Sequence, residues 1–209
     1  MNTSIIQFMP KLSKAGKMPC ESFSLPAQDC KTGSKLAQIK GSVCFDCYAL
    51  KGNYRFPTVK APRAHNLSLL DDLPLWIDNM IMTIKTTNAS GFFRWHDSGD
   101  LQSFAHLQAI ITIAERLPNI KFWIPTKEKS FLSKLTKLNI VIPQNLVIRL
   151  SMAMIDQAPS NSAWHLTSTV HQKGAPHGEE CEAYKQGGQC LTCRKCWDSS
   201  IANISYPKH

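Results

Sequence analysis

An alternation of strand-like and helix-like segments between residues 92 and 150 is the feature that most limits the folds open to this chain. Three short apolar runs, Phe92–Trp95, Ile120–Ile124 and Leu146–Leu150, are typical of buried strands. Between them, residues 101–117 and 128–138 place apolar side chains three and four positions apart, which predicts two helices. This order favours right-handed crossovers and a parallel sheet, so we expect an α/β fold of parallel βαβ units.

The segments on either side of this alternation are less regular. Residues 57–87 carry apolar side chains at helical spacing with two aspartates near the middle, Asp71 and Asp72, which predicts two helices separated there. Residues 1–43 mix Ser, Gly, Pro and Lys with short apolar groups, and we expect an irregular N-terminal arm. Near the end of the chain, three apolar residues indicate a closing helix or turn packed on the core: Trp197, Ile201 and Ile204.

Four thiols are concentrated in one short segment, at Cys181, Cys190, Cys193 and Cys196. Two residues lie between Cys190 and Cys193, and two between Cys193 and Cys196. This spacing lets successive thiolates face one centre. The pair Gly187-Gly188 gives the chain freedom to bring Cys181 round as the fourth ligand. We therefore predict a metal site, and the three-thiol run favours an iron–sulfur cluster over zinc, although both fit. The alternative is a set of disulfides or free buried thiols.

A second C-x2-C pair, Cys44 and Cys47, precedes a helix-like turn that ends at Gly52. Cys30 is a candidate for a third thiolate, so these three residues predict a second metal centre. The alternative is that some of them join the C-terminal cysteines on a single centre. Cys20 is more isolated, and we interpret it as a spare thiol.

Polar residues follow each of the three predicted strands. Because ligands bind beyond the carboxyl ends of parallel strands, these residues are candidates for contact with a ligand or cofactor. They are His96, Asp97, Ser98, Gly99 and Asp100 after the first strand, Thr126 after the second, and Ser151 after the third. The competing interpretation is structural, since Asp100 and Thr126 are good helix N-caps. Capping leaves His96 and Asp97 unexplained, and we expect the loop 96–100 to face the cysteine centre.

The chain has 209 residues, of which 43% are hydrophobic, enough for one sizeable core. We expect residues 1–180 to form the α/β domain with its arm, and residues 181–209 to form a metal-binding segment packed on that domain. The sequence has no apolar run of about 18 residues and no signal-peptide pattern, so we expect a cytoplasmic protein with no membrane partner. Eight cysteines in such a reducing compartment are more often metal ligands than cross-links.

The formal net charge of +9 is unevenly distributed. Residues 1–65 hold ten Lys and Arg against three acidic residues, a net of +7. Nucleic acid or another anionic partner is therefore a candidate for this basic third of the chain. Metal-bound thiolates would cancel part of the charge, and a solvated lysine-rich surface is the alternative interpretation.

Three motifs resemble those of a known family. At Cys44-Phe-Asp-Cys47-Tyr-Ala, Arg94-Trp-His-Asp-Ser-Gly-Asp100 and Ile148-Arg-Leu-Ser151, the sequence resembles an uncharacterised, cysteine-rich family found in bacteriophages and related mobile elements. The likeness runs from about Leu25 to His209. For a phage-encoded member it implies a location in the host cytoplasm.

More distantly, the order of cysteine pair, strand with a Gly-Asp loop, second strand, and strand ending in Arg-Leu-Ser resembles the first half of a radical S-adenosylmethionine barrel. That resemblance implies a partial barrel in which Cys30, Cys44 and Cys47 hold a [4Fe–4S] cluster that binds S-adenosylmethionine. It also implies that the loop 96–100 holds the amino group of that cofactor. The superfamily's usual spacing is C-x3-C-x2-C, whereas thirteen residues separate Cys30 from Cys44 here.

Three functional hypotheses follow. The first is an iron–sulfur protein with one or two [4Fe–4S] clusters that acts as a radical S-adenosylmethionine-like enzyme. The second is a zinc-stabilised module that binds nucleic acid or protein without catalysis, with the pairs 44/47 and 193/196 as knuckles. The third is a structural or host-interaction protein in which a cluster only stabilises the fold.

Overall fold

A computed structural model describes residues 8–160 and 163–208 of the chain. The order of elements along it alternates strands with helices, and η denotes a short 3-10 helix. The elements are β1 (Leu12–Ser13), β2 (Ser22–Phe23), η1 (Ala27–Asp29), α2 (Lys31–Leu36), η2 (Tyr48–Leu50), η3 (Gly52–Arg55), α3 (Pro57–Ser68), η4 (Leu69–Asp71), α4 (Leu73–Thr87), β3 (Phe92–Trp95), α5 (Phe104–Arg116), β4 (Lys121–Thr126), α6 (Lys129–Lys137), β5 (Leu146–Ile155), β6 (Thr167–His171), β7 (Glu179–Glu180), η5 (Glu182–Gln186), η6 (Lys195–Trp197) and β8 (Asn203–Pro207).

The strands of the described chain form one sheet in the order β1-β2-β3-β4-β5-β6-β8-β7. Only β1 and β2 pair antiparallel, and every other neighbouring pair is parallel. The parallel sheet predicted from residues 92–150 is therefore confirmed, as are the two helices on either side of Asp71. The carboxyl ends of the parallel strands meet at one edge of the sheet, and the loops that follow them can cooperate there.

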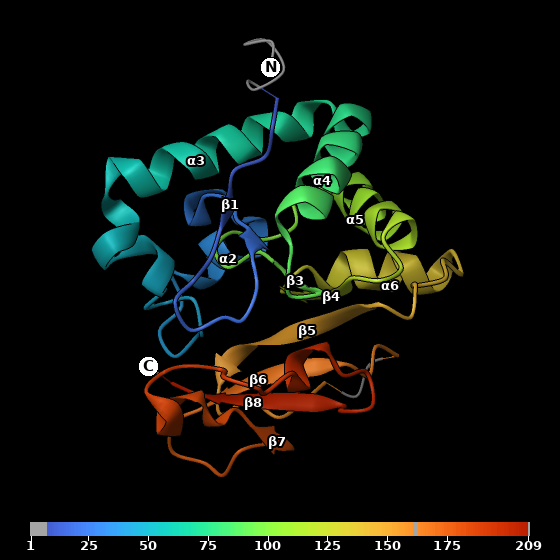
Figure 1. The fold of residues 1–209 in the computed structure, drawn as a ribbon. Helices are drawn as coiled ribbons and strands as arrows, with labels where there is room; N and C mark the ends of the chain where they lie inside the picture. Colours follow the sequence, from blue (N-terminus) through green and yellow to red (C-terminus); the bar gives the residue numbers. More distant parts are fainter. Residues whose placement is uncertain (1–7, 161–162, 209) are drawn as a thin grey trace.

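Helices cover one face of the sheet, where most of the core lies. Figure 1 shows α4, α5 and α6 on the same side of β5. Phe93 of β3, Phe122 of β4 and Ile148 of β5 point to this side and pack with Trp76 of α4 and Ile110 of α5, all of them fully or almost fully buried. Apolar residues two apart in each strand share a face, which explains why the strands and helices could be recognised from their spacing.

The C-terminal cysteine segment packs on the opposite face of the sheet. Trp123 and Val147 alternate with the residues that face the helices, and they pack in a second cluster with Cys20, Met18 and Trp197. The indole Nε1 of Trp197 also donates to the backbone oxygen of Phe93 at 2.9 Å. The N-terminal region and the C-terminal segment thus meet on the face that the helices leave free.

Two sequence-based expectations are wrong. The N-terminal region is not an irregular arm throughout, because β1, β2 and α2 form there and β2 pairs with β3 in parallel. The end of the chain is not a closing helix or turn at Ile204, because β8 pairs along its whole length with β6. The segment 181–209 therefore supplies a strand to the main sheet. None of the described helices is both long and apolar enough to cross a membrane.

Candidate metal centres

The first group of thiols, Cys30, Cys44 and Cys47, lies in the connection that leaves the carboxyl end of β2, the first parallel strand. Cys30 immediately precedes α2, and Cys47 immediately precedes η2. A methyl group added to Gly33 would lie 3.6 Å from the Cys30 sulfur and 3.7 Å from the Cys44 sulfur. The same methyl group would lie only 2.9 Å from the Cys30 Cβ, so the two thiols pack close to Gly33, which has no room for a side chain.

The thiols of this group affect one another and a nearby acid and base. The pKa of Cys30 is raised to about 12, first by burial and then by Asp100 and the two other thiols. Burial also raises the pKa of Cys44, while the ammonium of Lys127 acts in the opposite direction. At neutral pH the thiols of Cys30 and Cys44 are protonated without a metal, so a metal ion that binds them must displace protons.

Asp100 and Lys127 come from the loops after β3 and β4. Asp100 accepts hydrogen bonds from Thr126 Oγ1 at 2.7 Å, from the Lys127 amide at 2.8 Å and from the Leu101 amide at 2.7 Å. Burial nevertheless raises the pKa of Asp100 to about 6. Lys127 donates from Nζ to the backbone oxygen of Met152 at 3.0 Å, and burial lowers its pKa. A buried acid and a partly buried lysine thus lie beside the first thiols.

Glu128 fixes the start of α2, and with it the position of Cys30. Its two carboxylate oxygens accept from the backbone amide and the hydroxyl of Thr32, both at 2.9 Å. Thr32 lies in the first turn of α2, where amides lack partners within the helix and a negative charge is favourable. The loop after β4 therefore holds the segment that carries Cys30.

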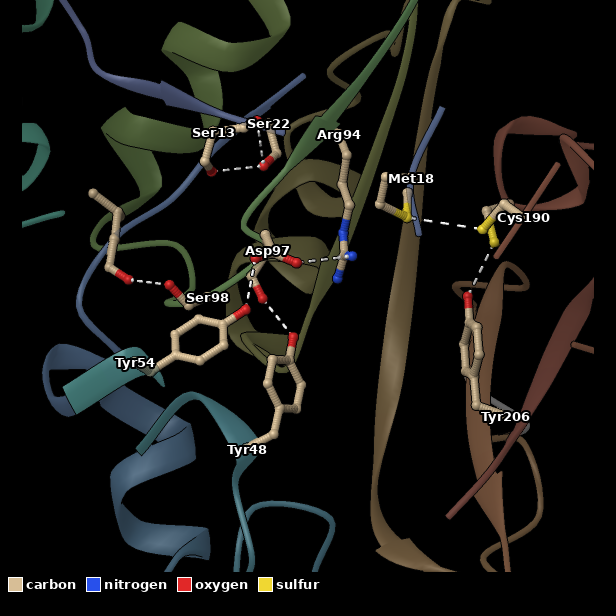
Figure 2. Close-up of polar contacts among 12 residues, drawn as sticks. Ser13, Met18, Ser22, Tyr48, Tyr54, Arg94, Asp97, Ser98, Cys190 and Tyr206 are labelled. Carbon is tan, nitrogen blue, oxygen red and sulfur yellow. Dashed lines mark hydrogen bonds and ion pairs between the residues drawn. The ribbon is translucent and has the colours of Figure 1, made fainter. Parts of the chain in front are cut away.

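Asp97 is the centre of a polar cluster with Arg94, Tyr48 and Tyr54 (Figure 2). Tyr54 donates to its Oδ2 at 2.8 Å, and Tyr48 donates to its backbone oxygen at 2.5 Å. The Arg94 guanidinium lies 3.2 Å from Oδ1 in a buried ion pair and stacks over Trp123 at 4.8 Å. Asp97 is thus saturated by protein groups that link β3 to the cysteine connection.

His96 turns away from this cluster, with a left-handed φ of 57°. Its ring packs against His106 of α5 with centroids 5.5 Å apart, on the side of the sheet that the helices cover. Both ring nitrogens are buried without a hydrogen-bond partner among the described residues. Burial lowers the pKa of His96 well below its ordinary value, so the ring is neutral.

The remaining predicted loop residues have structural contacts. Ser98 donates to the backbone oxygen of Leu25 at 2.8 Å and accepts from Arg63 Nε at 2.6 Å. Gly99, for which we expected a close approach to a ligand, instead lets the backbone pass against Leu25. Ser151 shares a hydrogen bond of 3.0 Å with Ser168 of β6. Of the predicted polar residues, Asp100 and Thr126 are the ones brought to the first thiols.

The second group of thiols is held between the N-terminal region and β8. The Cys190 amide donates to the backbone oxygen of Lys17 at 2.9 Å, and its sulfur lies 3.9 Å from the Met18 sulfur (Figure 2). The Cys196 sulfur lies 3.2 Å from the Tyr206 hydroxyl. The Cys181 amide donates to the backbone oxygen of Ser205 at 2.8 Å. Three chain segments therefore fix this group.

These four thiols also perturb one another. Burial raises the pKa of Cys196 to about 12, and Cys181 adds to the shift. Burial raises the pKa of Cys190, with further contributions from Cys181 and Cys193. Cys20 is fully buried next to this group, and burial raises its pKa to about 12. The two sets of cysteines predicted from spacing are thus two separate neighbourhoods.

Neither neighbourhood has the geometry of a filled metal site. Within residues 8–160 and 163–208, no three His, Cys, Asp or Glu side chains are arranged so that they could hold a metal ion. Binding would require the thiols of a group to turn toward a common point. The donor chemistry fits zinc or an iron–sulfur cluster, because both prefer thiolates.

Several residues of these neighbourhoods escaped the sequence analysis. Arg149 donates to backbone oxygens of the C-terminal cysteine segment, including that of Cys196. Tyr206 of β8 contacts the Cys196 sulfur, and Lys127 in the loop after β4 adjoins the first thiols. Only the Arg-Leu-Ser motif that contains Arg149 gave a signal, and it indicated a resemblance rather than a contact.

Comparison with known proteins gives one match. The family model described as Gene product 88 matches residues 2–199. No curated protein and no solved structure matches the chain.

Proposed function

The chain belongs to the gene product 88 family, and on that premise we propose that it is an iron–sulfur protein of phage type with two [4Fe–4S] clusters. Cys30, Cys44 and Cys47 would hold the first cluster, and the four cysteines from Cys181 to Cys196 the second. We also propose that the first cluster serves a radical S-adenosylmethionine-like reaction. The observation that carries the proposal is the three-thiol group at the carboxyl edge of the sheet, beside a buried acid, Asp100, and a partly buried lysine, Lys127.

The number of thiols in the first group is the reason for a catalytic cluster there. Four cysteines ordinarily saturate a [4Fe–4S] cluster, so three leave one iron open for a ligand. When bound, such a cluster supplies an electron to that ligand. Lys127 has ammonium protons to spare beyond its bond to Met152, and it could meet the carboxylate of an amino-acid-like cofactor. The Asp100 carboxylate already accepts three hydrogen bonds, and its remaining lone pair could accept one more from the ammonium of that cofactor.

The topology supports the same proposal. Proceeding from β2, the sheet contains β3, β4, β5, β6 and β8 as neighbours in chain order, all parallel. Sequential parallel strands are what a partial barrel requires, and the first thiols follow the first of these strands. Polar groups from the loops after β3 and β4 meet those thiols. A radical S-adenosylmethionine-like partial barrel is our proposal for this arrangement.

A zinc protein remains the second candidate, since thiols also suit zinc. A single zinc held by the pairs 44/47 and 193/196 is disfavoured by the electrostatics. The pKa of the Cys44 thiol is raised by Cys47, whereas the pKa of the Cys190 thiol is raised by Cys181 and Cys193. Each pair therefore interacts with thiols of its own group. Two separate zinc sites would be required, and the first would need a fourth ligand beyond its three cysteines.

The first experiment counts metal in anaerobically purified protein. We expect about eight irons and broad absorption at about 400 nm, reduced to about four irons when Cys44 and Cys47 are replaced with Ser. Cys193→Ser should remove the four irons of the second cluster. It should also destabilise the C-terminal segment, since metal-binding energy there is also folding energy. Cys20→Ala is the matched control and should keep all of the iron. Colourless protein with stoichiometric zinc would contradict the iron–sulfur proposal and support a zinc protein.

The second experiment tests reactivity. Reduction with dithionite in the presence of S-adenosylmethionine should release 5′-deoxyadenosine from the wild-type protein and from Cys20→Ala. Protein with the changes at Cys44 and Cys47 should release none, although its second cluster stays intact. If iron-loaded wild-type protein releases no 5′-deoxyadenosine, the radical reaction is excluded and the clusters have a purely structural role.

A further inference from the structure

A series of large apolar side chains is exposed on the stretch from residue 39 to residue 56. Their exposed fractions are 47% for Ile39, 45% for Phe45, 52% for Tyr48, 37% for Leu50 and 56% for Phe56. Single exposed apolar residues are normal on protein surfaces, but five within eighteen positions require an explanation. Three of the five are aromatic.

Basic side chains surround these apolar residues in sequence, and all of them are exposed. They are Lys31, Lys35, Lys40, Lys51, Arg55 and Lys60. The only acidic residue between positions 31 and 60 is Asp46, so this stretch has a net charge of +5. Asp46 forms an exposed ion pair of 2.6 Å with Lys51, which leaves the other five basic groups of the stretch uncompensated within it. We call residues 31–60 with these side chains the aromatic–lysine surface.

The backbone beneath this surface is tied to the rest of the fold. The Val43 amide donates to the backbone oxygen of Ala153 at 2.8 Å, and the Ile155 amide donates to that of Gly41 at 3.0 Å, which attaches the stretch to β5. The Tyr48 hydroxyl is fixed on the loop after β3. Because the backbone is held, the exposed rings are presented without an additional ordering cost.

We propose that the aromatic–lysine surface binds single-stranded nucleic acid. Exposed aromatic rings stack on unpaired bases, and lysines among them neutralise the phosphates. A duplex hides its base faces, so exposed rings contribute little to its binding, whereas charge alone would attract the duplex at least as strongly, because its phosphates are more densely spaced. The combination of three exposed rings with a net positive charge therefore favours a single strand. Phe45 and Tyr48 stand beside the predicted ligands Cys44 and Cys47, so the metal content of each variant has to be measured together with its nucleic-acid binding.

The test is fluorescence anisotropy with the full-length protein and labelled oligonucleotides of about 15 nucleotides, in single-stranded and duplex forms, at several salt concentrations. We expect the single strand to bind more tightly than the duplex. Replacing Phe45 and Phe56 together with Ala should weaken that binding about tenfold or more, because base stacking is lost. Replacing Lys35 and Lys40 together with Glu should weaken it and flatten its salt dependence.

A matched control comes from α4 and α6, where Lys85 and Lys137 are also exposed. Replacing both with Glu makes the same change in net charge and should leave binding within about twofold of the wild type. Equal binding of duplex and single strand, or equal losses in the two charge-reversal variants, would overturn the proposal. So would the absence of binding at low salt, as expected if the surface docks a protein instead. Iron content, measured in each variant, separates this outcome from failure of the proposed function.

Discussion

The guanidinium of Arg149 donates through Nε to the backbone oxygen of Cys196 at 3.1 Å, which joins the middle of β5 to the last predicted metal ligand. Its Nη1 donates to the backbone oxygen of Ile201 at 2.8 Å, and its Nη2 to that of Asp198 at 2.7 Å. Arg149 is fully buried, so these carbonyl oxygens accept hydrogen bonds from one buried guanidinium in place of water. A single strand residue thereby shapes the loop that carries Cys193 and Cys196.

Replacing Arg149 with Met should detach that loop. Several buried carbonyl oxygens would lose a charged donor, and we expect the free energy of unfolding to fall by about 3 kcal/mol or more, as measured by urea denaturation. Iron at the second group of cysteines should fall in parallel, because its ligands are no longer positioned.

Arg116→Met is the matched control. Arg116 forms an ion pair of 2.7 Å with Asp78 in which both side chains are at least half exposed. Its removal should cost less than about 1 kcal/mol and leave the iron content unchanged. Equal effects of the two substitutions would show that Arg149 does not organise the cysteine loop.

Gly99 offers a second prediction, this time for the loop after β3. It has a φ of +82°, and an added Cβ would lie 2.5 Å from the Leu25 Cβ and 2.8 Å from the Leu25 oxygen. Gly99→Ala should therefore combine left-handed strain with overpacking, and lower the free energy of unfolding by at least about 3 kcal/mol. Gly52 has a φ of +51° and open space around it, so Gly52→Ala should show the strain alone, about 1–2 kcal/mol. Thermal or urea unfolding of both variants measures the difference, and similar losses would contradict the packing argument.

The regular parts of the fold were predictable because their side chains alternate or recur with clear periods. Phe92–Trp95 is β3 with the predicted bounds, and helices α3 and α4 separate at the predicted aspartates. The strand β2 escaped because two residues, Ser22 and Phe23, are too few to show a period.

The strand β8 escaped for a different reason. Its Asn203 and Ser205 are buried polar residues, and Asn203 satisfies its amide on Thr169 and on the backbone of His177. A strand whose buried side chains are polar shows no alternation of apolar residues in the sequence. The last predicted apolar anchor, Ile204, lies in this strand rather than in a turn.

The cysteine groups were predictable from local spacing, but their supports were not. Glu128 contacts Thr32 across 96 positions, and Cys196 meets Arg149 across 47. Such contacts depend on the completed sheet, which brings the loops after β2 and β4 to one edge. The orientation of His96 toward His106 was not predictable either, because it follows from the left-handed backbone at His96 and not from its residue type.

Glu128 should matter for the first cysteine group in particular. Glu128→Ala removes both acceptors of Thr32, so the start of α2 loses its anchor, and we expect a loss of about 1–2 kcal/mol in the free energy of unfolding. Iron at Cys30, Cys44 and Cys47 should decrease, while iron at the second group is retained. The control is Glu115→Ala, an exposed residue near the end of α5 that should change neither quantity. Loss of iron from both groups alike would indicate general unfolding instead.

The pH dependence of stability should reveal the buried histidines. Burial lowers the pKa of His106 to about 3, whereas the unfolded chain has an ordinary value of about 6.5. Below pH 6.5 the unfolded state therefore binds more protons, and folding stability falls as the pH falls. The loss due to His106 amounts to about 1 kcal/mol at pH 5.5 and grows with further acidification. His96, which packs against it, contributes in the same direction.

His106→Asn isolates this effect, because the Asn amide oxygen can replace Nδ1 as acceptor for the Gln102 amide, which now lies at 3.3 Å. Asp100 acts in the opposite sense, since its pKa is raised to about 6 and its protonation favours the folded state as the pH falls from 6 toward 4. The wild-type profile is a sum of these contributions, so the informative quantity is the difference between the two proteins. Urea denaturation followed by tryptophan fluorescence at pH 7, 6 and 5.5 should give a free energy of unfolding that decreases less steeply for His106→Asn. Parallel profiles would mean that His106 is protonated in the folded state, and its buried ring would then require a partner that compensates the charge.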